Sequence, residues 1–213
     1  KLTKIDITTV ISMASLAHNY MMSKKCYEGC VNLSCSTHDF IRLSVVGGRC
    51  MTRENKKWYV HYISDYDACS LYPSAMFRLG RDLGGYLKGS PKEIIDLDYN
   101  KIKMFDGYFV EILITKVGKK RAFPDMSLMT DEGVRNFTNE MEDKTMVVNR
   151  IQLEDLIEFH EIEFEIIRGV YFDEGRCNTV MSVILDLYME RLKFKGEGNP
   201  IQLVYKLLMN SSY

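Results

Sequence analysis

The sequence contains no apolar run near the ~20 residues that a membrane-spanning helix needs. It also lacks an excess of positive charge, because 28 Lys and Arg stand against 29 Asp and Glu. Any contact with nucleic acid therefore has to come from local clusters. The first residues, Lys1-Leu2-Thr3-Lys4, include neither a start methionine nor a signal-peptide core. We expect an intracellular protein with no membrane contact, cut at both ends from a longer chain.

Cysteine is sparse as well, with six in 213 residues, too few for a disulfide-stapled secreted fold of this size. Reduced thiols are the expectation. Cys26, Cys30, Cys35 and His38 have ligand types that suit zinc, although the segment lacks the paired C-x2-C knuckles of strong zinc motifs. Ordinary thiols in an irregular segment and a zinc-binding interaction module both stay open, and the loose spacing favours the thiols.

What the chain does contain is a mixed pattern, with 46% hydrophobic residues and no low-complexity tract. Apolar side chains at helical spacing predict a helix over residues 7–23. Residues 26–38 read as a loop, and Phe40–Val46 reads as a strand that ends at Gly47-Gly48. The paired glycine permits a backbone geometry that side chains would forbid.

The run from Trp58 to Asp67 is aromatic and β-branched, which predicts a strand with both faces largely covered. Asp67 falls at its C-terminal end, and a period of two puts Asp65 on the same face. A short helix is expected after Pro73. Further along, the pattern predicts strands at 107–116, 147–150 and 162–172 and a helix at 151–160, giving an α+β fold.

The last part of the chain predicts an antiparallel helical hairpin. Thr179–Lys195 is amphipathic, Gly196-Glu197-Gly198 interrupts it, and Asn199-Pro200 has the N-cap and first-turn residues of a second helix. At ~1.5 Å per residue, Arg191 and Lys206 both lie roughly 6 to 9 Å from the hairpin tip, so they could face each other.

Two strings carry the chemistry: Asp67-Ala68-Cys69-Ser70-Leu71-Tyr72-Pro73-Ser74 and Lys206-Leu207-Leu208-Met209-Asn210-Ser211-Ser212-Tyr213. A carboxylate at a strand end before a tight turn suits a metal site, and a lysine one helical turn before an asparagine suits phosphate recognition. Together and in this order, the strings resemble motifs A and B of family B DNA polymerases, closest to the protein-primed branch of viruses, linear plasmids and selfish elements.

The resemblance implies template-directed addition of deoxynucleotides to a 3′-hydroxyl with two Mg²⁺ ions. By its motif A, Asp67 is a catalytic metal ligand and Ala68 adds its backbone carbonyl. Ser70, Leu71 and Tyr72 would contact the incoming nucleotide, with Tyr72 excluding a 2′-hydroxyl by steric clash. Asp65 is expected to be supporting or structural.

By motif B, Lys206 binds the nucleotide's phosphates, while Asn210 and Tyr213 line the nucleotide and base-pair pocket. Arg191 and Lys195 match the R-x3-K pair that finger helices of this family direct at the triphosphate. Such a pair is by itself more often a solvated helix face, but its place opposite Lys206 favours phosphate binding.

Val45-Val46-Gly47-Gly48 resembles the Y-x-G-G element of the protein-primed branch, which helps position DNA, although the tyrosine is valine here. The basic turn of Lys116, Lys119, Lys120 and Arg121 reads equally well as a DNA or terminal-protein contact and as a solvated hairpin tip. The acidic run between Glu154 and Glu165 reads as a solvated face.

The resemblance divides the chain into a partial palm and fingers: 1–48 as N-terminal connection, 49–87 as palm with motif A, 88–150 as a terminal-protein-region-like insertion, 151–177 as palm, and 178–213 as fingers. The expected partners are primer-template DNA, dNTPs and a priming terminal protein. The expected location of the protein is a viral replication site in the host cytoplasm or nucleus. Motif B usually continues with glycine, and no second Asp-rich strand is present, so we expect an inactive fragment. A non-catalytic nucleic-acid-binding or scaffold relic is the alternative.

Overall fold

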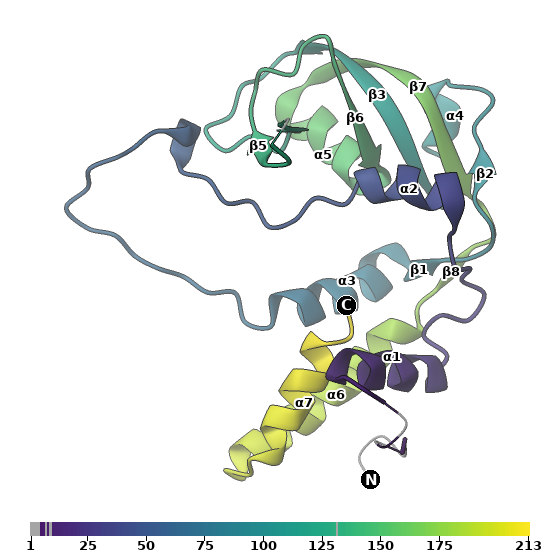
Figure 1. Ribbon diagram of the computed structural model, residues 1–213, viewed down its shortest axis with the longest axis vertical. Helices are drawn as coiled ribbons and strands as arrows, with labels where there is room; N and C mark the ends of the chain where they lie inside the picture. Colours follow the sequence, from purple (N-terminus) through teal and green to yellow (C-terminus); the bar gives the residue numbers. More distant parts are fainter. Residues whose placement is uncertain (1–4, 7, 9, 131) are drawn as a thin grey trace. The chain divides into compact units, whose positions relative to one another are not determined.

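The computed structural model describes residues 5–6, 8, 10–130 and 132–213 (Figure 1). It separates into two compact units. The first contains the described residues up to Val31 together with Asp65–Gly89 and Glu174–Tyr213, and the second contains Asn32–Ser64 and Ser90–Asp173. Helices and antiparallel strands occur in both units, which confirms the α+β class.

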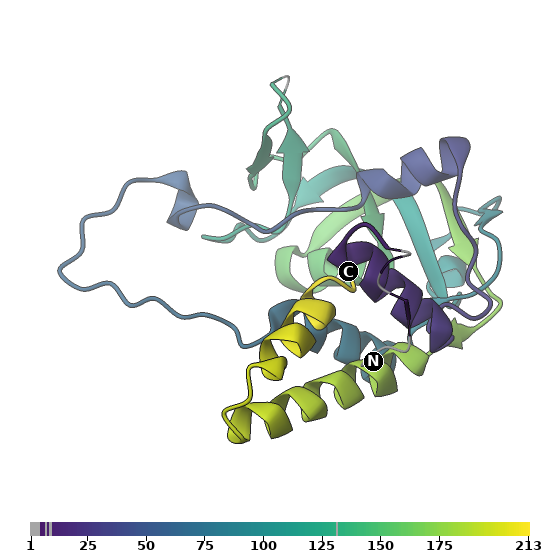
Figure 2. The ribbon, with the colours of Figure 1, turned by 60° about the horizontal axis from the view of Figure 1, so that its bottom comes forward.

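The first unit is mainly helical. It contains α1 (Met13–Ser23), α3 (Leu71–Leu83), α6 (Thr179–Gly196) and α7 (Ile201–Asn210), with a short antiparallel pair of β1 (Tyr86–Leu87) and β8 (Arg176–Cys177). Figure 2 shows α6 and α7 side by side as the expected antiparallel hairpin. The stack of Phe194 on Tyr205, with ring centroids 5.6 Å apart, joins the two helices.

Two helix starts in this unit differ by a few residues from the sequence prediction. Helix α1 begins at Met13, because the Ser12 hydroxyl caps it by accepting from the Ser15 backbone N–H at 3.1 Å. The predicted N-cap at Asn199 and first helical position at Pro200 are each one residue early, because Pro200 is the N-cap of α7 and Ile201 its first helical residue. The Asn199 side chain accepts from the Ile201 N–H at 3.0 Å. Positions 7 and 9 of the predicted first helix lie outside the described residues.

Close packing of α3 on α6 depends on Gly80. A Cβ built on Gly80 would lie 2.4 Å from the Cβ of Met181 and 3.2 Å from its backbone nitrogen. The backbone of α3 therefore approaches α6 more closely than any side chain at position 80 would permit. Met76 on α3 and Val180, Val183 and Ile184 on α6 are buried in the same core.

The second unit is built on a four-stranded antiparallel sheet with the order β2 (Lys92–Glu93), β7 (Ile162–Phe172), β3 (Gly107–Val117) and β6 (Lys144–Asn149). A hairpin of β4 (Ser127–Met129) and β5 (Arg135–Phe137) adds a small second sheet. The helices are α2 (Cys35–Leu43), α4 (Tyr99–Ile102), α5 (Arg150–His160) and the 3₁₀ turn η2 (Arg53–Asn55).

Alternation along β3 makes the core of this unit. Tyr108, Val110, Ile112 and Ile114 are all buried on one face, where Leu153 and Leu156 of α5 join the same cluster. A capping box starts α5: Asn149 accepts from the Gln152 N–H, and the Gln152 side chain accepts from the Asn149 N–H, both at 3.0 Å. The predicted strands near 107–116, 147–150 and 162–172 and the helix at 151–160 are thus confirmed.

The predicted strand from Trp58 to Asp67 is wrong. This segment has no helix or strand, and its side chains are exposed, with Tyr59 at 86% and Tyr62 at 93%. Aromatic and β-branched residues favour a strand only where a neighbouring strand satisfies the backbone N–H and C=O groups. Among the described strands none pairs with this segment.

The expected strand at Phe40–Val46 is also wrong, because Cys35–Leu43 forms helix α2. Phe40 is its buried residue, covered by the guanidinium of Arg168 at 4.8 Å from the ring centroid. The fold does not use the backbone freedom that the paired glycine permits, since neither Gly47 nor Gly48 has a positive φ and a Cβ on either would meet nothing within 4 Å.

His160, the last residue of α5, fastens the loop between β3 and β4. Its ring is fully buried, Nδ1 lies 3.1 Å from the Lys119 carbonyl, and Nε2 accepts from the Asp125 N–H at 3.2 Å. Nδ1 must therefore carry the proton of the neutral ring. Burial lowers the pKa of His160, against the opposing effects of the Lys119 carbonyl and Asp125.

We predict that Gly80→Ala destabilises the chain by about 1–3 kcal/mol, because overpacking against Met181 outweighs the roughly 1 kcal/mol gained in helix propensity. Urea unfolding followed by circular dichroism measures the change. Gly196→Ala is the matched control, since a Cβ at this last residue of α6 meets nothing within 4 Å. Equal stability of the two variants would contradict a close α3–α6 contact.

We also predict that stability declines as the pH falls below the ordinary histidine pKa of 6.5. Since the pKa of folded His160 is the lower one, the unfolded chain takes up the proton first, and stability is lost as the pH falls toward the folded pKa. Ring-proton NMR titration of His160 checks this directly, and His160→Gln should flatten the decline. A folded-state pKa at or above 6.5 would rule the arrangement out.

Candidate nucleotide-binding site

A left-handed residue sets the direction of the chain where Asp67-Ala68-Cys69-Ser70 meets helix α3. Ser70 is the N-cap, with φ 50° and ψ 50°, an uncommon conformation for a residue other than glycine. The Ser70 carbonyl accepts from the Ser74 N–H at 2.9 Å. Pro73 is tolerated in this first turn, and the N–H groups of Leu71 and Tyr72 have no partner inside the helix.

Arg191 of α6 reaches this turn. Its Nη1 donates to the Ser70 Oγ at 3.1 Å, and its Nε is buried without a hydrogen-bond partner among the described residues. A buried donor without a partner is costly, by about 1–3 kcal/mol. The side chain is thus held beside the turn and keeps unused hydrogen-bonding capacity there.

One tyrosine from each sequence string contacts the other within the first unit. Tyr72 of α3 and Tyr213 after α7 stack with ring centroids 4.1 Å apart and an angle of 10° between the planes. About half of each side chain stays exposed, 52% for Tyr72 and 63% for Tyr213. Residues of the two sequence strings, which are far apart in the chain, are therefore neighbours in space.

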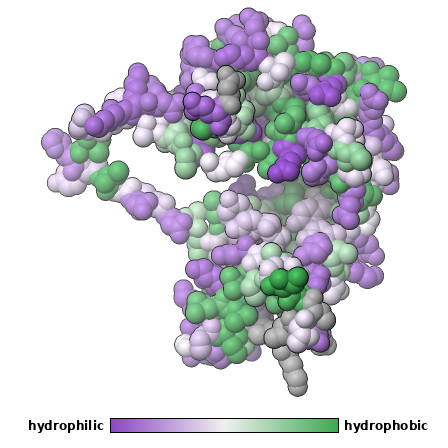
Figure 3. Space-filling model, in the orientation of Figure 1, coloured by the Kyte–Doolittle hydropathy of each residue, from purple (hydrophilic) through white to green (hydrophobic). Residues whose placement is uncertain are grey.

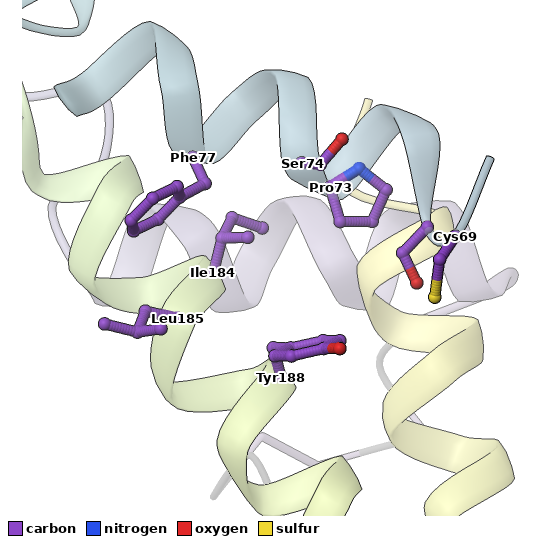
Figure 4. Close-up of a pocket in the computed structure, with 8 residues that line it drawn as sticks. Cys69, Pro73, Ser74, Phe77, Ile184, Leu185 and Tyr188 are labelled. Carbon is purple, nitrogen blue, oxygen red and sulfur yellow. The ribbon is translucent and has the colours of Figure 1, made fainter. Parts of the chain in front are cut away.

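A pocket of about 270 Å³ opens beside the turn, between α3 and α6. Figure 4 shows Pro73 and Phe77 of α3 directed toward Ile184 and Tyr188 of α6, with the Cys69 thiol at one end. Sequence reasoning missed this pocket. Its sequence signal is that Cys69, Ser70, Pro73 and Ser74 belong to the first motif, whereas Phe77 and Tyr188 read as ordinary core residues.

The remaining predicted residues of the hairpin lie on its surface. Lys195, Lys206 and Asn210 are exposed, and neither lysine forms an ion pair with a described residue. The exposed face of α7 also includes Leu203, Val204 and Leu207, and Figure 3 shows hydrophobic surface over the hairpin. The closeness of Arg191 to Lys206, expected from their distance to the tip, stays a prediction.

Asp67 and Asp65 are both exposed in the irregular segment before the turn, without the strand that was to align them. No group of three or more His, Cys, Asp or Glu side chains in the described ranges is arranged to hold a metal ion. The chemistry of the donors nevertheless fits Mg²⁺, which takes hard oxygen ligands and binds through one or two carboxylates with water and substrate phosphates. Asp67 and the Ala68 carbonyl supply oxygens of that kind.

The cysteine segment gives no support to zinc. Cys26 is buried in the helical core with its thiol 3.8 Å from the Met21 sulfur, and burial raises its pKa to about 11. Burial also raises the pKa of Cys30. Metal ligation needs thiolates, so these two side chains are poor ligands.

Gly47 and Gly48 belong to the second unit and are exposed. The fold itself does not require glycine at either position, because a Cβ would meet nothing. Their neighbour Arg49 was missed from the sequence: Nη1 donates to the carbonyls of Phe123 and Pro124, both at 3.1 Å, and to the Asp125 carboxylate at 2.7 Å. Arg49 thereby ties the glycine segment to the β3–β4 loop.

Comparison with known proteins identifies the family. The family model described as DNA polymerase type B, organellar and viral, matches residues 1–213. A search of the curated proteins gives no significant match. No described helix is long and apolar enough to cross a membrane.

Three solved structures of Phi29 DNA polymerase share the fold. The complex with primer-template DNA has a TM-score of 0.61 at 17% identity and covers 95% of this chain and 34% of that chain. The ternary complex with primer-template DNA and incoming nucleotides has a TM-score of 0.56 at 15% identity and covers 94% and 34%. The complex with single-stranded DNA has a TM-score of 0.54 at 17% identity and covers 95% and 34%.

The chain spans about a third of the length of these polymerase chains. At such low identity, the likeness establishes the fold alone, whereas the family model covers the whole sequence. The chain belongs to the DNA polymerase type B family, organellar and viral.

Proposed function

We propose that this chain is the palm-and-fingers part of a replicative DNA polymerase that adds deoxynucleotides to a 3′-hydroxyl by two-metal nucleotidyl transfer. The observation that carries the proposal is the meeting of the two motifs, where Tyr72 stacks on Tyr213. Arg191 of the R-x3-K pair donates a hydrogen bond to Ser70 of the first motif. The family match supports the same reading. The enzyme would work inside the cell, at a viral replication site in host cytoplasm or nucleus.

The triphosphate would lie at the start of α3. There the free N–H groups of Leu71 and Tyr72 and the positive end of the helix dipole favour an anion. Arg191 is already at this turn, and Lys195 and Lys206 have no carboxylate partner among the described residues that would compete with phosphate. Charge-assisted hydrogen bonds from such cations are about twice as strong as neutral ones.

Asp67 and the Ala68 carbonyl would hold Mg²⁺, which neutralises the phosphate charge that develops during transfer. One carboxylate is not enough for a two-metal site, so we propose that these residues bind nucleotide without polymerising it. Tyr72 would lie under the deoxyribose, with Asn210 and Tyr213 beside the nascent base pair. Asp65 is proposed to be supporting or structural.

The partners we propose are primer-template DNA and dNTPs, with Gly47 and Gly48 allowing close approach of a DNA backbone. We also propose residues 88–150 as the contact for a priming terminal protein, which is what the resemblance of the sequence motifs to the protein-primed branch implies. The remaining division is the one expected from the sequence: 1–48, 49–87 and 151–177 on the palm side, and 178–213 as fingers.

Nucleotide binding tests the proposal. We predict that the chain binds a fluorescent dATP analogue in the presence of Mg²⁺, and that Lys206→Ala weakens binding about tenfold, because one charge-assisted phosphate bond is lost. Fluorescence anisotropy gives the dissociation constants.

Lys193→Ala is the matched control, since Lys193 is an exposed cation of the same hairpin that lies against Phe194. Its affinity should equal that of the unmodified chain. If Lys206→Ala binds like this control, or if the unmodified chain binds no nucleotide, the reading as a non-catalytic relic takes over.

Sugar discrimination tests Tyr72. We predict that Tyr72→Ala lowers the preference for dATP over ATP about tenfold, because the ring that would clash with a 2′-hydroxyl is gone. Tyr72→Phe should keep the preference, since it retains the ring and its stack on Tyr213. The ratio of the two dissociation constants is the measurement, and an unchanged ratio in Tyr72→Ala would exclude the role.

A further inference from the structure

The basic turn at the end of β3 consists of Lys116, Lys119, Lys120 and Arg121. One of these four cations has no ion-pair partner among the described residues. Lys116 pairs with Glu163, Lys119 lies 3.8 Å from Glu161, and Lys120 lies 2.8 Å from Glu140. Arg121 forms no ion pair with the described residues. The turn is therefore mostly compensated, and its free positive charge is concentrated at Arg121.

The backbone of Arg121 is held in place from two sides. Its N–H donates to the Asn139 Oδ1 and its carbonyl accepts from the Asn139 Nδ2, both at 2.9 Å. His160 fixes Lys119 and Asp125 on either side of it. An exposed side chain on a backbone anchored in this way loses less conformational freedom when it binds a ligand than one on a loose loop.

The Arg121 guanidinium lies over the ring of Phe159, 5.3 Å from the centroid. Among the described residues, the guanidinium forms one hydrogen bond, which is long, at 3.5 Å from Nη1 to the Phe159 carbonyl. The rest of its donors remain available. Phe159 is exposed at 36% and Phe123 at 45%, although the Arg49 guanidinium lies 5.9 Å from the centroid of the Phe123 ring. A cation and two partly exposed aromatic rings are thus presented together.

These groups surround a hollow of about 390 Å³, lined by Arg49, Arg121, Ala122, Phe123, Asp125 and Phe159. Asp125 neutralises Arg49 at 2.7 Å, which leaves Arg121 as the charge that faces a ligand. The neighbouring hollow around Gly47 shares Arg49 and Asp125 with this one and adds the carboxylate of Asp155. That additional negative charge makes the Arg121 side the more favourable place for a phosphate contact.

We propose that the hollow beside Arg121 binds an unpaired segment of a DNA strand. Arg121 contacts a backbone phosphate, and a base stacks on the exposed faces of Phe123 and Phe159. Aromatic platforms beside a positive charge suit single strands because every base offers a flat face. The proposal takes DNA as the partner from the proposed function, but it uses none of the nucleotide-binding residues.

Binding of a fluorescein-labelled oligothymidylate, measured by anisotropy at several salt concentrations, tests the site. Arg121→Ala should weaken binding about tenfold and lower the slope of log affinity against log salt by about 0.7, since one phosphate contact is lost. Phe159→Leu should weaken binding about tenfold and leave the slope unchanged, because a base–ring stack releases no counterion.

Lys119→Ala is the matched control from the same turn, and it should bind like the unmodified chain because Glu161 already lies beside this lysine. Arg121→Gln, which keeps most of the side chain, provides a second test if Arg121→Ala disturbs folding. Circular dichroism checks each variant.

Wild-type affinity in Arg121→Ala or Arg121→Gln would overturn the site, as would failure of the unmodified chain to bind the oligonucleotide. If Arg121→Ala binds a poly-glutamate peptide more weakly than the unmodified chain but binds DNA equally well, the DNA site is overturned in favour of an acidic protein partner. Binding of dATP by the unmodified chain is measured separately, so failure of the proposed function and failure of this site give different results.

Discussion

The close approach of α3 to α6 is the constraint on which the candidate nucleotide site depends. Gly80 lets the two backbones meet over Met181, and this contact fixes the direction in which the first turn of α3 points. The turn before it needs a second unusual backbone, the left-handed Ser70. Arg191 on α6 then reaches the Ser70 hydroxyl one turn beyond the packed core, so the position of this arginine at the proposed phosphate site follows from helix packing.

Periodicity identified the helices and strands whose apolar side chains recur at a regular spacing in the sequence. Strand β3, with alternate residues buried, was predicted correctly because its pattern is regular and because β6 and β7 supply its hydrogen-bond partners. The hairpin of α6 and α7 was predicted from two helical segments with a break between them. The segment from Trp58 to Asp67 has the composition of a strand and lacks a described strand to pair with. A sequence pattern reports what a strand would bury, but the backbone hydrogen bonds that stabilise it come from elsewhere in the fold.

The candidate site likewise has features that the sequence predicted and features that depend on the rest of the fold. The order of the two motifs indicated that Tyr72 and Tyr213 belong to one place, and their rings do stack. The contact of Arg191 with Ser70 was not predictable, because it depends on how far α3 lies along α6. Gly47 and Gly48 show the limit of such patterns: a paired glycine permits unusual backbone geometry, but neither residue has a positive φ, and there is open space around both. Because glycine has no side chain, another backbone can approach these two positions closely.

Charge in the second unit follows from strand register, which is why the basic turn and the acidic run looked independent in the sequence. The antiparallel pairing of β3 with β7 brings Lys116 opposite Glu163, and the end of α5 brings Glu161 to Lys119. Exposed pairs of this kind add only about 0–1 kcal/mol each to stability. Their larger effect is to cancel the field of the turn, so that the proposed recognition of an anion rests on Arg121, which has no ion pair among the residues that the structure describes. Net charge along a segment is thus a poor guide to a binding surface, because what a ligand meets is the charge that remains after the fold has formed its own pairs.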